Sequence, residues 1–423
     1  MKVLIVGGGG REHALAWKAL QSPQVDRVYV APGNAGTELE DGIENIAVGA
    51  EDIESLLEFA SGNGIGLTIV GPEAPLVAGI VDRFETSGLT IFGPSANAAQ
   101  LEGSKTFTKD FLARHQIPSA DYQSFTEIDA ACAYVAGRDT PIVIKADGLA
   151  AGKGVIIAQS PAGAEAAITD MLAGNRFGEA GHRVVIEEFL QGEEASYICI
   201  VDGEQVLPMA SSQDHKARDN GDLGPNTGGM GAYSPAPVLS AEIEARVMQD
   251  IILPTVRGMQ AEGNRYRGFL YAGLMIGADG AARVLEYNCR FGDPETQPIM
   301  MRLQSDLVEL CLAACHGELD GKSTQWDERA SLGVVLAAAG YPDSYARGEL
   351  IGNIPPESNN GKVFHAGTRR DANGSILSDG GRVLCAVGLG ENIAAAQRQA
   401  YDIVAEIDWK TAYFRTDIGF KAL

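Results

Sequence analysis

The sequence predicts a mixed α/β protein: an amino-terminal doubly wound parallel sheet, a central part of α+β character and a small, mostly β carboxy-terminal part. Three observations support this prediction. Short apolar strands alternate with helices up to about residue 100, β-branched strands flank a long central loop, and a final group of strands precedes one closing helix. Alternating strands and helices are typical of a parallel sheet. We expect domains at 1–103, 104–325 and 326–423, with a flap subdomain at about 120–190.

The amino-terminal part contains apolar runs of strand length between runs of helix length. The expected strands are 2–7, 27–33, 67–75 and 90–95, and the expected helices are 11–20, 52–60 and 76–88. Ligands of doubly wound sheets bind at the carboxyl ends of the strands. Those ends read GGGGRE, APGNAGT, GPEAP and FGPS, which are all small enough to approach a ligand closely.

The rest of the chain is richer in β-branched residues. A basic helix at 104–116 precedes expected strands at 141–148, 154–159, 184–190, 269–277, 282–293, 331–342, 362–368 and 381–390, and a helix at 392–407 closes the chain. Residues 208–237 are rich in Gly, Pro, Asn and Asp, so we expect a loop without secondary structure. A loop of this length is either disordered or functional.

Bulk composition excludes several functional classes. A hydrophobic content of 45% with 21% charged residues is that of a soluble globular protein, and no apolar run reaches the ~18 residues of a membrane span. The net charge of −23 disfavours nucleic acid as a partner, although a small phosphorylated ligand needs only a few local cations. The start, MKVLIVGGGG, enters a strand without a cleavable signal pattern, so we expect a cytoplasmic protein.

Residues 146–155, ADGLAAGKGV, resemble a Walker A loop but do not match one. Three residues rather than four separate Gly148 from Gly152, and Gly154 follows Lys153 where a Ser or Thr would stand. The small residues still allow backbone N–H groups to close over phosphates. If this flap holds a nucleotide, it therefore does so within another architecture.

The first glycine loop, VGGGGREH, fails the dinucleotide-binding fingerprint. Its third glycine position falls on Glu12 or His13, depending on the frame, and no acidic residue follows the second strand. Gly9, Gly10 and Arg11 still lie where a strand leads into a helix, and N–H groups at a helix start suit a phosphate. The alternative is a glycine turn needed only for packing.

Two lysines lie where they could neutralise nucleotide phosphates. Lys145 ends the apolar strand PIVIK immediately before the flap, and Lys105 begins the basic helix. A lysine ammonium at such a place can act as a point charge on the α- and β-phosphates of ATP. A strand-end lysine is otherwise usually a solvated charge, and the neighbouring flap favours the functional interpretation. The predicted phosphate contacts are Lys105, Lys145, Gly148, Gly152, Lys153 and Gly154.

The segment VVIEEFLQGEEAS, 184–196, suits the rest of a nucleotide. An adenine ring needs an apolar slot with main-chain donors and acceptors, and a ribose needs a carboxylate a few residues further on. The residues predicted at the adenine are Glu187, Glu188, Phe189 and Leu190. For the ribose we choose Glu194, with Glu193 as the alternative. A solvated acidic edge is the competing interpretation.

The stretch VLEYNCRFGDPETQP predicts a metal and phosphoryl site. Glu286 and Asn288 alternate along a strand, so their side chains share one face, and their oxygens are hard ligands suited to Mg²⁺. Arg290 continues that face and can reach a phosphoryl group in transfer. The turn GDPE then brings Asp293 and Glu295 to the same mouth.

These motifs together resemble those of the phosphoribosylamine–glycine ligases, which belong to the ATP-grasp superfamily. The resemblance covers the whole chain and rests on GGREHALAWK, APGNAGT, VGPEAPLV, FGPS, KADGLAAGKGV, QDHK, GPNTGGMGAYSPAP and RFGDPETQP. One departure is VGGGG, where a polar residue such as Asn is expected at one glycine. The resemblance implies a nucleotide held between two sheets, under a glycine flap and without a Walker loop.

The resemblance also implies a reaction and residue roles. Glycine, ATP and 5-phosphoribosylamine would be the substrates, Mg²⁺ (or Mn²⁺) the metal, and glycyl phosphate the intermediate. Glu286 and Asn288 would bind the metal, Arg290 would contact the phosphoryl group, and the loop with Asp214 and Lys216 would cover the site and take part in catalysis. The expected contacts of the other substrates are Gly9, Gly10, Arg11, Glu73, Asp293 and Glu295.

Two other functional classes compete with this hypothesis. One is a different ATP-grasp carboxylate–amine ligase with another acceptor, and the other is a nucleotide-binding regulatory module without catalysis. The complete set of Glu286, Asn288 and Arg290 disfavours the second class. We expect a monomer that binds small molecules and neither nucleic acid nor membrane.

Overall fold

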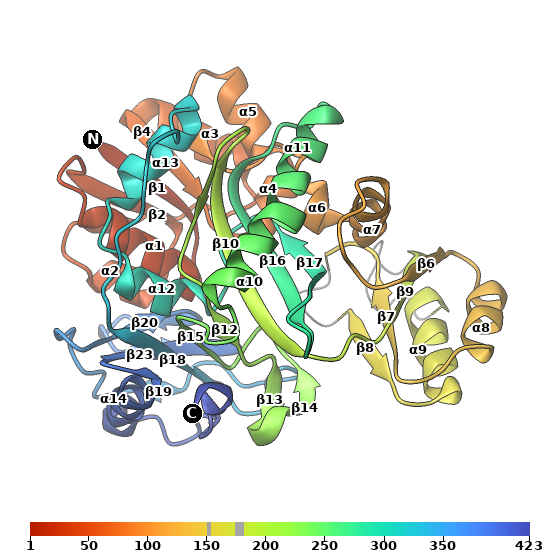
Figure 1. Cartoon of the computed structure of the whole chain (residues 1–423). Helices are drawn as coiled ribbons and strands as arrows, with labels where there is room; N and C mark the ends of the chain where they lie inside the picture. Colours follow the sequence, from red (N-terminus) through yellow and green to blue (C-terminus); the bar gives the residue numbers. More distant parts are fainter. Residues whose placement is uncertain (150–153, 174–181) are drawn as a thin grey trace.

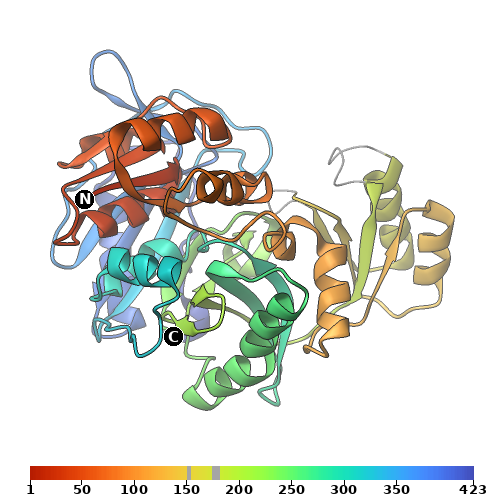
Figure 2. The same cartoon turned by 90° about the horizontal axis from the view of Figure 1, so that it is seen from above.

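The computed structural model describes residues 1–149, 154–173 and 182–423. The chain forms an amino-terminal sheet, a central pair of sheets and a carboxy-terminal sheet, and one of the central sheets stands to the right of the rest of the molecule in both views (Figures 1 and 2). Within the described residues no helix is long and apolar enough to cross a membrane.

The amino-terminal part is an all-parallel, five-stranded sheet. Its strands, in spatial order, are β3 (Ile43–Asn45), β2 (Arg27–Pro32), β1 (Lys2–Gly7), β4 (Ile65–Val70) and β5 (Ile91–Phe92). Its helices are α1 (Gly10–Leu20), α2 (Ala35–Leu39), α3 (Ile53–Asn63), α4 (Glu73–Val77) and α5 (Ile80–Thr86). The strand order reverses between β1 and β4, and ligands of doubly wound sheets bind at such a switch point. The short β3 is an addition to the four strands that the sequence predicted.

The central part contains two sheets that face each other across a cleft. The smaller one is β6 (Tyr122–Phe125), β9 (Val184–Glu188), β7 (Ile142–Ala146) and β8 (Val155–Ala158), with α8 (Ile128–Ala136) and α9 (Pro161–Ala173). The larger one is β11 (Val206–Pro208), β10 (Glu193–Asp202), β16 (Arg267–Ile276) and β17 (Ala282–Asn288), with α10 (Ala241–Val247), the π-helix η3 (Met248–Ile252) and α11 (Leu253–Ala261). Helices α6 (Gln100–Gly103) and α7 (Lys105–Arg114) connect the central part to the amino-terminal sheet.

The carboxy-terminal sheet incorporates strands from the central part. Its strands are β12 (Gln213–Asp214), β15 (Gly231–Ser234), β18 (Ala330–Ala337), β23 (Arg382–Gly390) and β20 (Gly361–His365). The remaining elements are β13 (Ala217–Asp219), η2 (Asn220–Asp222), β14 (Leu223–Asn226), α12 (Thr296–Arg302), α13 (Leu307–His316), β19 (Leu350–Ile351), β21 (Thr368–Arg370), β22 (Ile376–Ser378), α14 (Ile393–Glu406) and η4 (Phe420–Ala422).

The expectation of a structureless loop at 208–237 is therefore wrong. Four short strands lie within it, and β15 pairs antiparallel with β18, which joins this segment to the carboxy-terminal sheet. The mixed α/β class, with a parallel amino-terminal sheet and antiparallel sheets after it, is confirmed.

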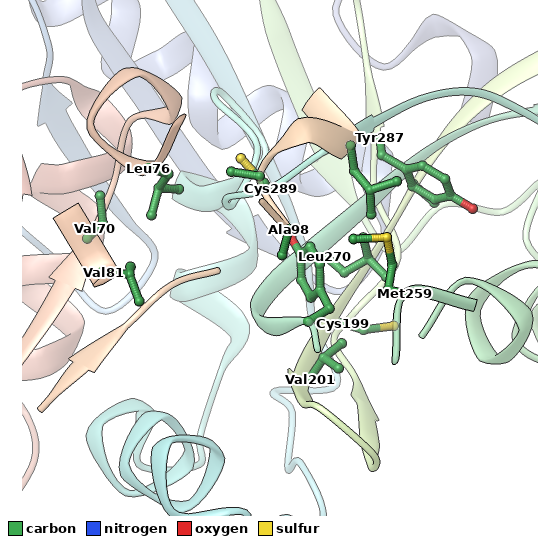
Figure 3. Packing of buried hydrophobic residues seen from close by; sticks show 14 of the residues in the cluster. Val70, Leu76, Val81, Ala98, Cys199, Val201, Met259, Leu270, Tyr287 and Cys289 are labelled. Atoms are coloured by element: carbon green, nitrogen blue, oxygen red, sulfur yellow. The ribbon is translucent and has the colours of Figure 1, made fainter. Parts of the chain in front are cut away.

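One apolar core joins the amino-terminal part to the central part. Figure 3 shows side chains of both parts in the same cluster, with Ala98 and Cys289 between them. The labelled members are Val70, Leu76 and Val81 from the amino-terminal part and Cys199, Val201, Met259, Leu270 and Tyr287 from the central part. Because interiors pack at crystal-like density, this shared core holds the carboxyl end of β4 at a fixed place relative to β17.

Candidate active site

A cavity of about 560 Å³ lies where the two central sheets meet the amino-terminal sheet. It brings together most of the side chains that the sequence analysis singled out. The predicted residues that line it are Arg11, Glu73, Lys105, Lys145, Gly148, Gly154, Glu187, Glu188, Phe189, Leu190, Glu194, Asp214, Lys216, Glu286, Asn288, Arg290, Asp293 and Glu295. Gly152 and Lys153 lie outside the described residues.

The two predicted phosphate lysines enter the cavity from different elements. Lys105, at the start of α7, donates from Nζ to the carbonyl oxygen of Gly148 at 2.7 Å. Lys145, at the end of β7, forms an ion pair with Glu187 Oε1 at 2.9 Å and donates to the carbonyl oxygen of Leu285 at 3.0 Å. Burial lowers the pKa of Lys105, so an added anion would restore the charge that burial disfavours.

The predicted adenine slot lies at the end of β9. Leu190 is buried, and the side chain of Glu188 forms an ion pair with Arg283 Nη1 at 3.1 Å, which leaves the main chain of Glu188 available to an adenine base. Ile157 of β8 is 41% exposed although it is a large apolar side chain, and it lines the same cavity. An exposed apolar side chain inside a cavity is what an aromatic ring would cover.

Strand pairing distinguishes the two carboxylates considered for the ribose. Glu194 lines the cavity, and its Oε2 lies 3.0 Å from Lys216 Nζ. Glu193 is the adjacent residue of β10, and its side chain accepts a hydrogen bond from Gln213 at 3.5 Å. Successive side chains of a strand point to opposite faces, and register with β16 turns Glu194 toward the cavity.

The predicted metal face lies at the end of β17. Burial by itself would raise the pKa of Glu286, but Lys216, Lys145 and Lys105 outweigh burial and hold it below its usual value, so the carboxylate is ionised. Lys216 Nζ lies 3.7 Å from Glu286 Oε1. Asn288 Oδ1 accepts a hydrogen bond from Arg290 Nη2 at 3.2 Å and retains a second lone pair.

Arg290 is held between carboxylates. Its Nη2 lies 3.0 Å from Glu102 Oε1 and its Nε lies 3.4 Å from Glu73 Oε2. Glu102 also accepts hydrogen bonds from the backbone N–H of Cys289 at 2.7 Å and from its thiol. The guanidinium is therefore fixed at the junction of the amino-terminal loops and the metal face.

Two further carboxyl groups lie deep in the cavity. Burial raises the pKa of Asp214 to about 7, although Lys216 opposes the shift. Glu295 Oε1 accepts hydrogen bonds from the hydroxyls of Ser196 and Tyr271, each at 3.0 Å. Lys216 balances this negative charge, and Glu194, Asp214 and Glu286 outweigh its burial and raise its pKa well above its usual value.

The glycine loop after β1 lies beside the cavity rather than in its lining. A Cβ atom placed on Gly9 would lie 3.7 Å from Asp293 Oδ2, and one on Gly10 would lie 2.5 Å from Gln297 Nε2. Arg11 does line the cavity, and its Nη1 donates to the carbonyl oxygen of Phe291 at 3.3 Å. The loop therefore lies close to the GDPE turn and to the start of α12, and Arg11 is the residue of this loop whose side chain reaches the cavity.

Sequence reasoning missed three charged residues of this site. Glu102 fixes Arg290, and Arg382 forms an ion pair with Asp293 at 3.1 Å, yet both act across long sequence separations and have no local motif. Lys109 approaches Glu187 Oε2 at 3.4 Å. Lys109 could have been predicted from the sequence, because Lys105 and Lys109 are four residues apart and therefore share one helix face.

Models of a known family match nearly the whole chain. Residues 1–102 match the N domain of phosphoribosylglycinamide synthetase, residues 103–296 match its ATP-grasp (A) domain, and residues 331–421 match its C domain. The resemblance read from the motifs is thereby confirmed.

Individual proteins agree with the family models. A phosphoribosylamine–glycine ligase from Salmonella typhimurium is 65% identical over 424 aligned positions, which cover 100% of this chain and 99% of that protein. A crystal structure of the corresponding ligase from Thermotoga maritima has a TM-score of 0.85 at 33% identity and covers 99% of this chain and 100% of that one. The biotin carboxylase domain of Hydrogenobacter thermophilus 2-oxoglutarate carboxylase, solved with MgADP, ADP and bicarbonate, shares the fold with a TM-score of 0.75 at 15% identity over 98% of this chain and 91% of that one.

The family models account for an amino-terminal, an ATP-grasp and a carboxy-terminal domain in the order in which the structure places them. The bacterial relatives match from end to end. This chain therefore belongs to the phosphoribosylamine–glycine ligase family of ATP-grasp enzymes.

Proposed function

We propose that the chain ligates glycine to 5-phosphoribosylamine with consumption of ATP, giving glycinamide ribonucleotide, ADP and phosphate in de novo purine biosynthesis. The main structural support for this proposal is the composition of the cavity. A single cavity joins lysines suited to nucleotide phosphates, an ionised Glu286 beside Asn288, and the switch-point loops of the amino-terminal sheet. The names of the full-length relatives support the same reaction.

The reaction has two balanced steps. A carboxylate oxygen of glycine attacks the γ-phosphorus of ATP, and the bond to the bridging oxygen breaks, which releases ADP and leaves glycyl phosphate. The amine nitrogen of phosphoribosylamine then attacks the acyl carbon, the bond to the phosphate oxygen breaks, and the amine loses a proton. No enzyme nucleophile is needed, so catalysis rests on positioning and charge neutralisation.

The proposed roles follow from the geometry. Lys105 and Lys145 bind the nucleotide phosphates, Arg290 neutralises the phosphoryl group in transfer, and Glu295 binds the ammonium of glycine. Asp214, with a pKa of about 7, is suited to accept the proton of the attacking amine at neutral pH.

Phosphoribosylamine is assigned to the switch point of the amino-terminal sheet. Gly9, Gly10 and Arg11 offer a helix start and a guanidinium to its phosphate. Glu73, at the start of α4, and Asp293 face the same mouth and can hold ribose hydroxyls. The small distance between the glycine loop and the GDPE turn supports this arrangement, because a Cβ atom on Gly9 would lie 3.7 Å from Asp293 Oδ2.

The residues at the end of β17 fit a divalent metal. Within the described part of the chain no group of three or more His, Cys, Asp and Glu side chains could hold a metal ion. A metal at Glu286 and Asn288 would take its further ligands from substrate phosphates and water. Mg²⁺ is commonly bound in this way, by one or two protein oxygens together with substrate phosphates. When bound by Glu286 and Asn288 it would offset negative charge on the outer phosphates, and Mn²⁺ could replace it.

The remaining assignments concern the whole chain. We propose domains at 1–103, 104–325 and 326–423, which the bounds of the family models support. We also propose a cytoplasmic monomer that binds no nucleic acid, for which the net charge of −23 is the support. Light scattering after gel filtration would test the monomer, and a dimer mass would contradict it.

The decisive experiment measures ADP release while each substrate is omitted in turn. We expect release to require ATP, a divalent metal, glycine and phosphoribosylamine together. Equal release without glycine would refute the proposed substrate. Full release with another amine in place of phosphoribosylamine would identify a ligase with a different acceptor.

A further inference from the structure

The segment that carries Asp214 and Lys216 presents two faces to different surroundings. Asp214 and Lys216 both line the active-site cavity, whereas His215 between them does not. Side chains alternate between the faces of an extended segment, so His215 points away from the cavity. It is completely buried there, against the last residues of the chain.

His215 is bonded on both ring nitrogens. Its Nε2 accepts a hydrogen bond from the backbone N–H of Gly419 at 2.9 Å, which requires a lone pair on Nε2. The proton of the neutral ring is then on Nδ1, which faces Asp222 Oδ1 at 3.4 Å. Burial lowers the pKa of His215 and favours this neutral form, and the ring of Phe420 lies 5.5 Å away, centroid to centroid.

Asp222 connects His215 to Arg415. Arg415 is fully buried, and its Nη1 donates to Asp222 Oδ1 at 2.8 Å and to the carbonyl oxygen of Ala217 at 3.1 Å. Its other nitrogens bind both carboxylate oxygens of Asp417, each at 2.8 Å. Lys421 supplies a further cation to Asp222 at 2.6 Å.

Other side chains extend the same contact along residues 218–222. Asn220 and Thr416 exchange two hydrogen bonds, of 2.7 and 3.0 Å, and the N–H of Gly221 donates to Asp417 at 2.7 Å. The hydroxyl of Tyr413 donates to Asp219 at 2.6 Å. Figure 1 shows the carboxy-terminus close to β12 and β13, although it follows these strands by about two hundred residues in the sequence.

We propose that Arg415 is a positioning residue for the ligation reaction. Acting through Asp222, His215 and the carbonyl of Ala217, it fixes the segment that presents Asp214 and Lys216 to the substrates. The last residues of the chain thereby complete an active site to which they contribute no side chain. This inference rests on the role proposed above for Asp214 and on the part in catalysis that the family resemblance implies for Lys216.

The test compares Arg415→Met with a matched control, Arg329→Met. Arg329 belongs to the same part of the chain and also binds both oxygens of an aspartate two residues away, Asp327, but its other side-chain contacts are Asn359 and Asn360. For each purified full-length variant, kcat, the KM for ATP and the ratio of ADP to ligated product are measured. Arg415→Lys tests rescue, because lysine restores the charge at Asp222.

For Arg415→Met we expect kcat to fall at least about tenfold, since a misplacement of about 1 Å can cost a factor of about 100 in rate. The KM for ATP should stay within about twofold, because the nucleotide contacts lie on other elements. The ratio of ADP to product should rise above one as water reaches the acyl phosphate. Arg415→Lys should recover part of kcat, and Arg329→Met should match the wild type.

An unchanged kcat with a ratio of one in Arg415→Met would overturn the proposal, as would an equal loss in Arg329→Met. If Arg415→Met does not fold, Asp222→Ala carries the test, because Asp222 is partly exposed and alanine has no oxygen to accept from Arg415 or His215. Asp214→Asn separates the proposal from its premise. Full activity of Asp214→Asn would refute the role of Asp214, whereas an inactive Asp214→Asn beside a fully active Arg415→Met would refute the positioning role alone.

Discussion

Lys145 belongs to the proposed nucleotide site, and we expect its replacement to weaken ATP binding without unfolding the protein. Replacing it with methionine removes a charge-assisted contact worth about 1.5–3 kcal/mol, so the Kd for ATP should rise about tenfold or more. Glu187 would keep Lys109 as a partner at 3.4 Å, so the folded state should persist. Calorimetric titration with ATP measures the effect.

Lys322 provides the control for this prediction. It forms an ion pair with Glu309 at 2.7 Å on the surface, and Lys322→Met should leave ATP affinity unchanged. An unaltered Kd in Lys145→Met would show that Lys145 is a structural partner of Glu187 and not a phosphate ligand.

Glu286→Gln separates turnover from binding. Glutamine keeps the shape and one oxygen donor but removes the charge that suits Mg²⁺, so kcat at low magnesium should fall by about a hundredfold, the cost of losing one electrostatic stabiliser. ATP binding should weaken only moderately, because the adenine slot lies on β9. Asn288→Ala should show a milder form of the same defect.

Steady-state kinetics at varied magnesium concentration measure this change. Glu262→Gln, which alters a surface partner of Arg114 at 3.0 Å, should behave as the wild type. Near-normal turnover of Glu286→Gln at low magnesium would place the metal elsewhere.

The loops after β1 and β2 form a close pair of elements. A Cβ on Gly8 would lie 2.6 Å from the backbone oxygen of Gly33, and a backbone atom cannot move aside as a side chain can. Gly8→Ala should therefore cost about 1–3 kcal/mol of stability and raise the KM for phosphoribosylamine by shifting Gly9 and Gly10. Thermal unfolding and substrate titration measure the two effects.

Gly49 is the matched control for Gly8, because a Cβ there meets no atom within 4 Å. Gly49→Ala should leave the melting temperature and the KM unchanged. If Gly8→Ala lowers the melting temperature but leaves the KM for phosphoribosylamine unaltered, the switch-point loop does not bind that substrate.

Elements with local signals were predictable from the sequence, and elements held by distant partners were not. Apolar runs marked β1, β2 and β4, and alternation placed Glu286 and Asn288 on one face. By contrast, β12 and β15 are two and four residues long, too short to show a period. β12 pairs with β15, and β15 pairs with β18, about a hundred residues later. Most individual site residues remain predictions until tested.

The same reasoning explains the missed site residues. Glu102 meets Arg290 only because α6 packs beside the end of β17, and no spacing in the sequence records that contact. Glu193 and Glu194 are adjacent, so the sequence alone did not decide which one faces the cavity. Register between β10 and β16 decides it, and register is a property of the assembled sheet.

At the scale of the whole molecule, a buried polar cluster joins the first and last domains. The backbone N–H of His365 donates to His13 Nδ1 at 2.9 Å, so the other ring nitrogen carries the proton toward Glu40 at 3.1 Å. Lys362 approaches the same carboxylate at 2.5 Å. Burial alone would raise the pKa of Glu40, but His13 and Lys362 outweigh it and lower the pKa from 4.5 to about 2.

This cluster predicts a pH dependence of stability. A carboxylate with a depressed pKa in the folded state contributes fully above its ordinary pKa of 4.5 and loses that contribution as pH falls toward about 2. At neutral pH, Glu40→Gln should lower the free energy of unfolding by about 1.5–3 kcal/mol, the value of a hydrogen bond to a charged group. The difference from the wild type should shrink across that acidic window in urea titrations.

Glu44→Gln is the control for Glu40, because Glu44 pairs with Arg27 in an exposed position. It should change stability little at any pH. A deficit of Glu40→Gln that stays constant down to the acid limit would mean that the carboxylate charge is not what joins the two domains.

The pairing of β15 with β18 has a consequence for the synthesis of the chain. While β18 is still to be translated, β15 on the emerging polypeptide offers an unpaired edge of buried-type residues, and such edges recruit strands from neighbouring chains. A message truncated before codon 330 would therefore yield a fragment prone to aggregation rather than a shorter soluble enzyme. Ribosome pausing ahead of that point would lengthen the time for which this strand edge stays unpaired.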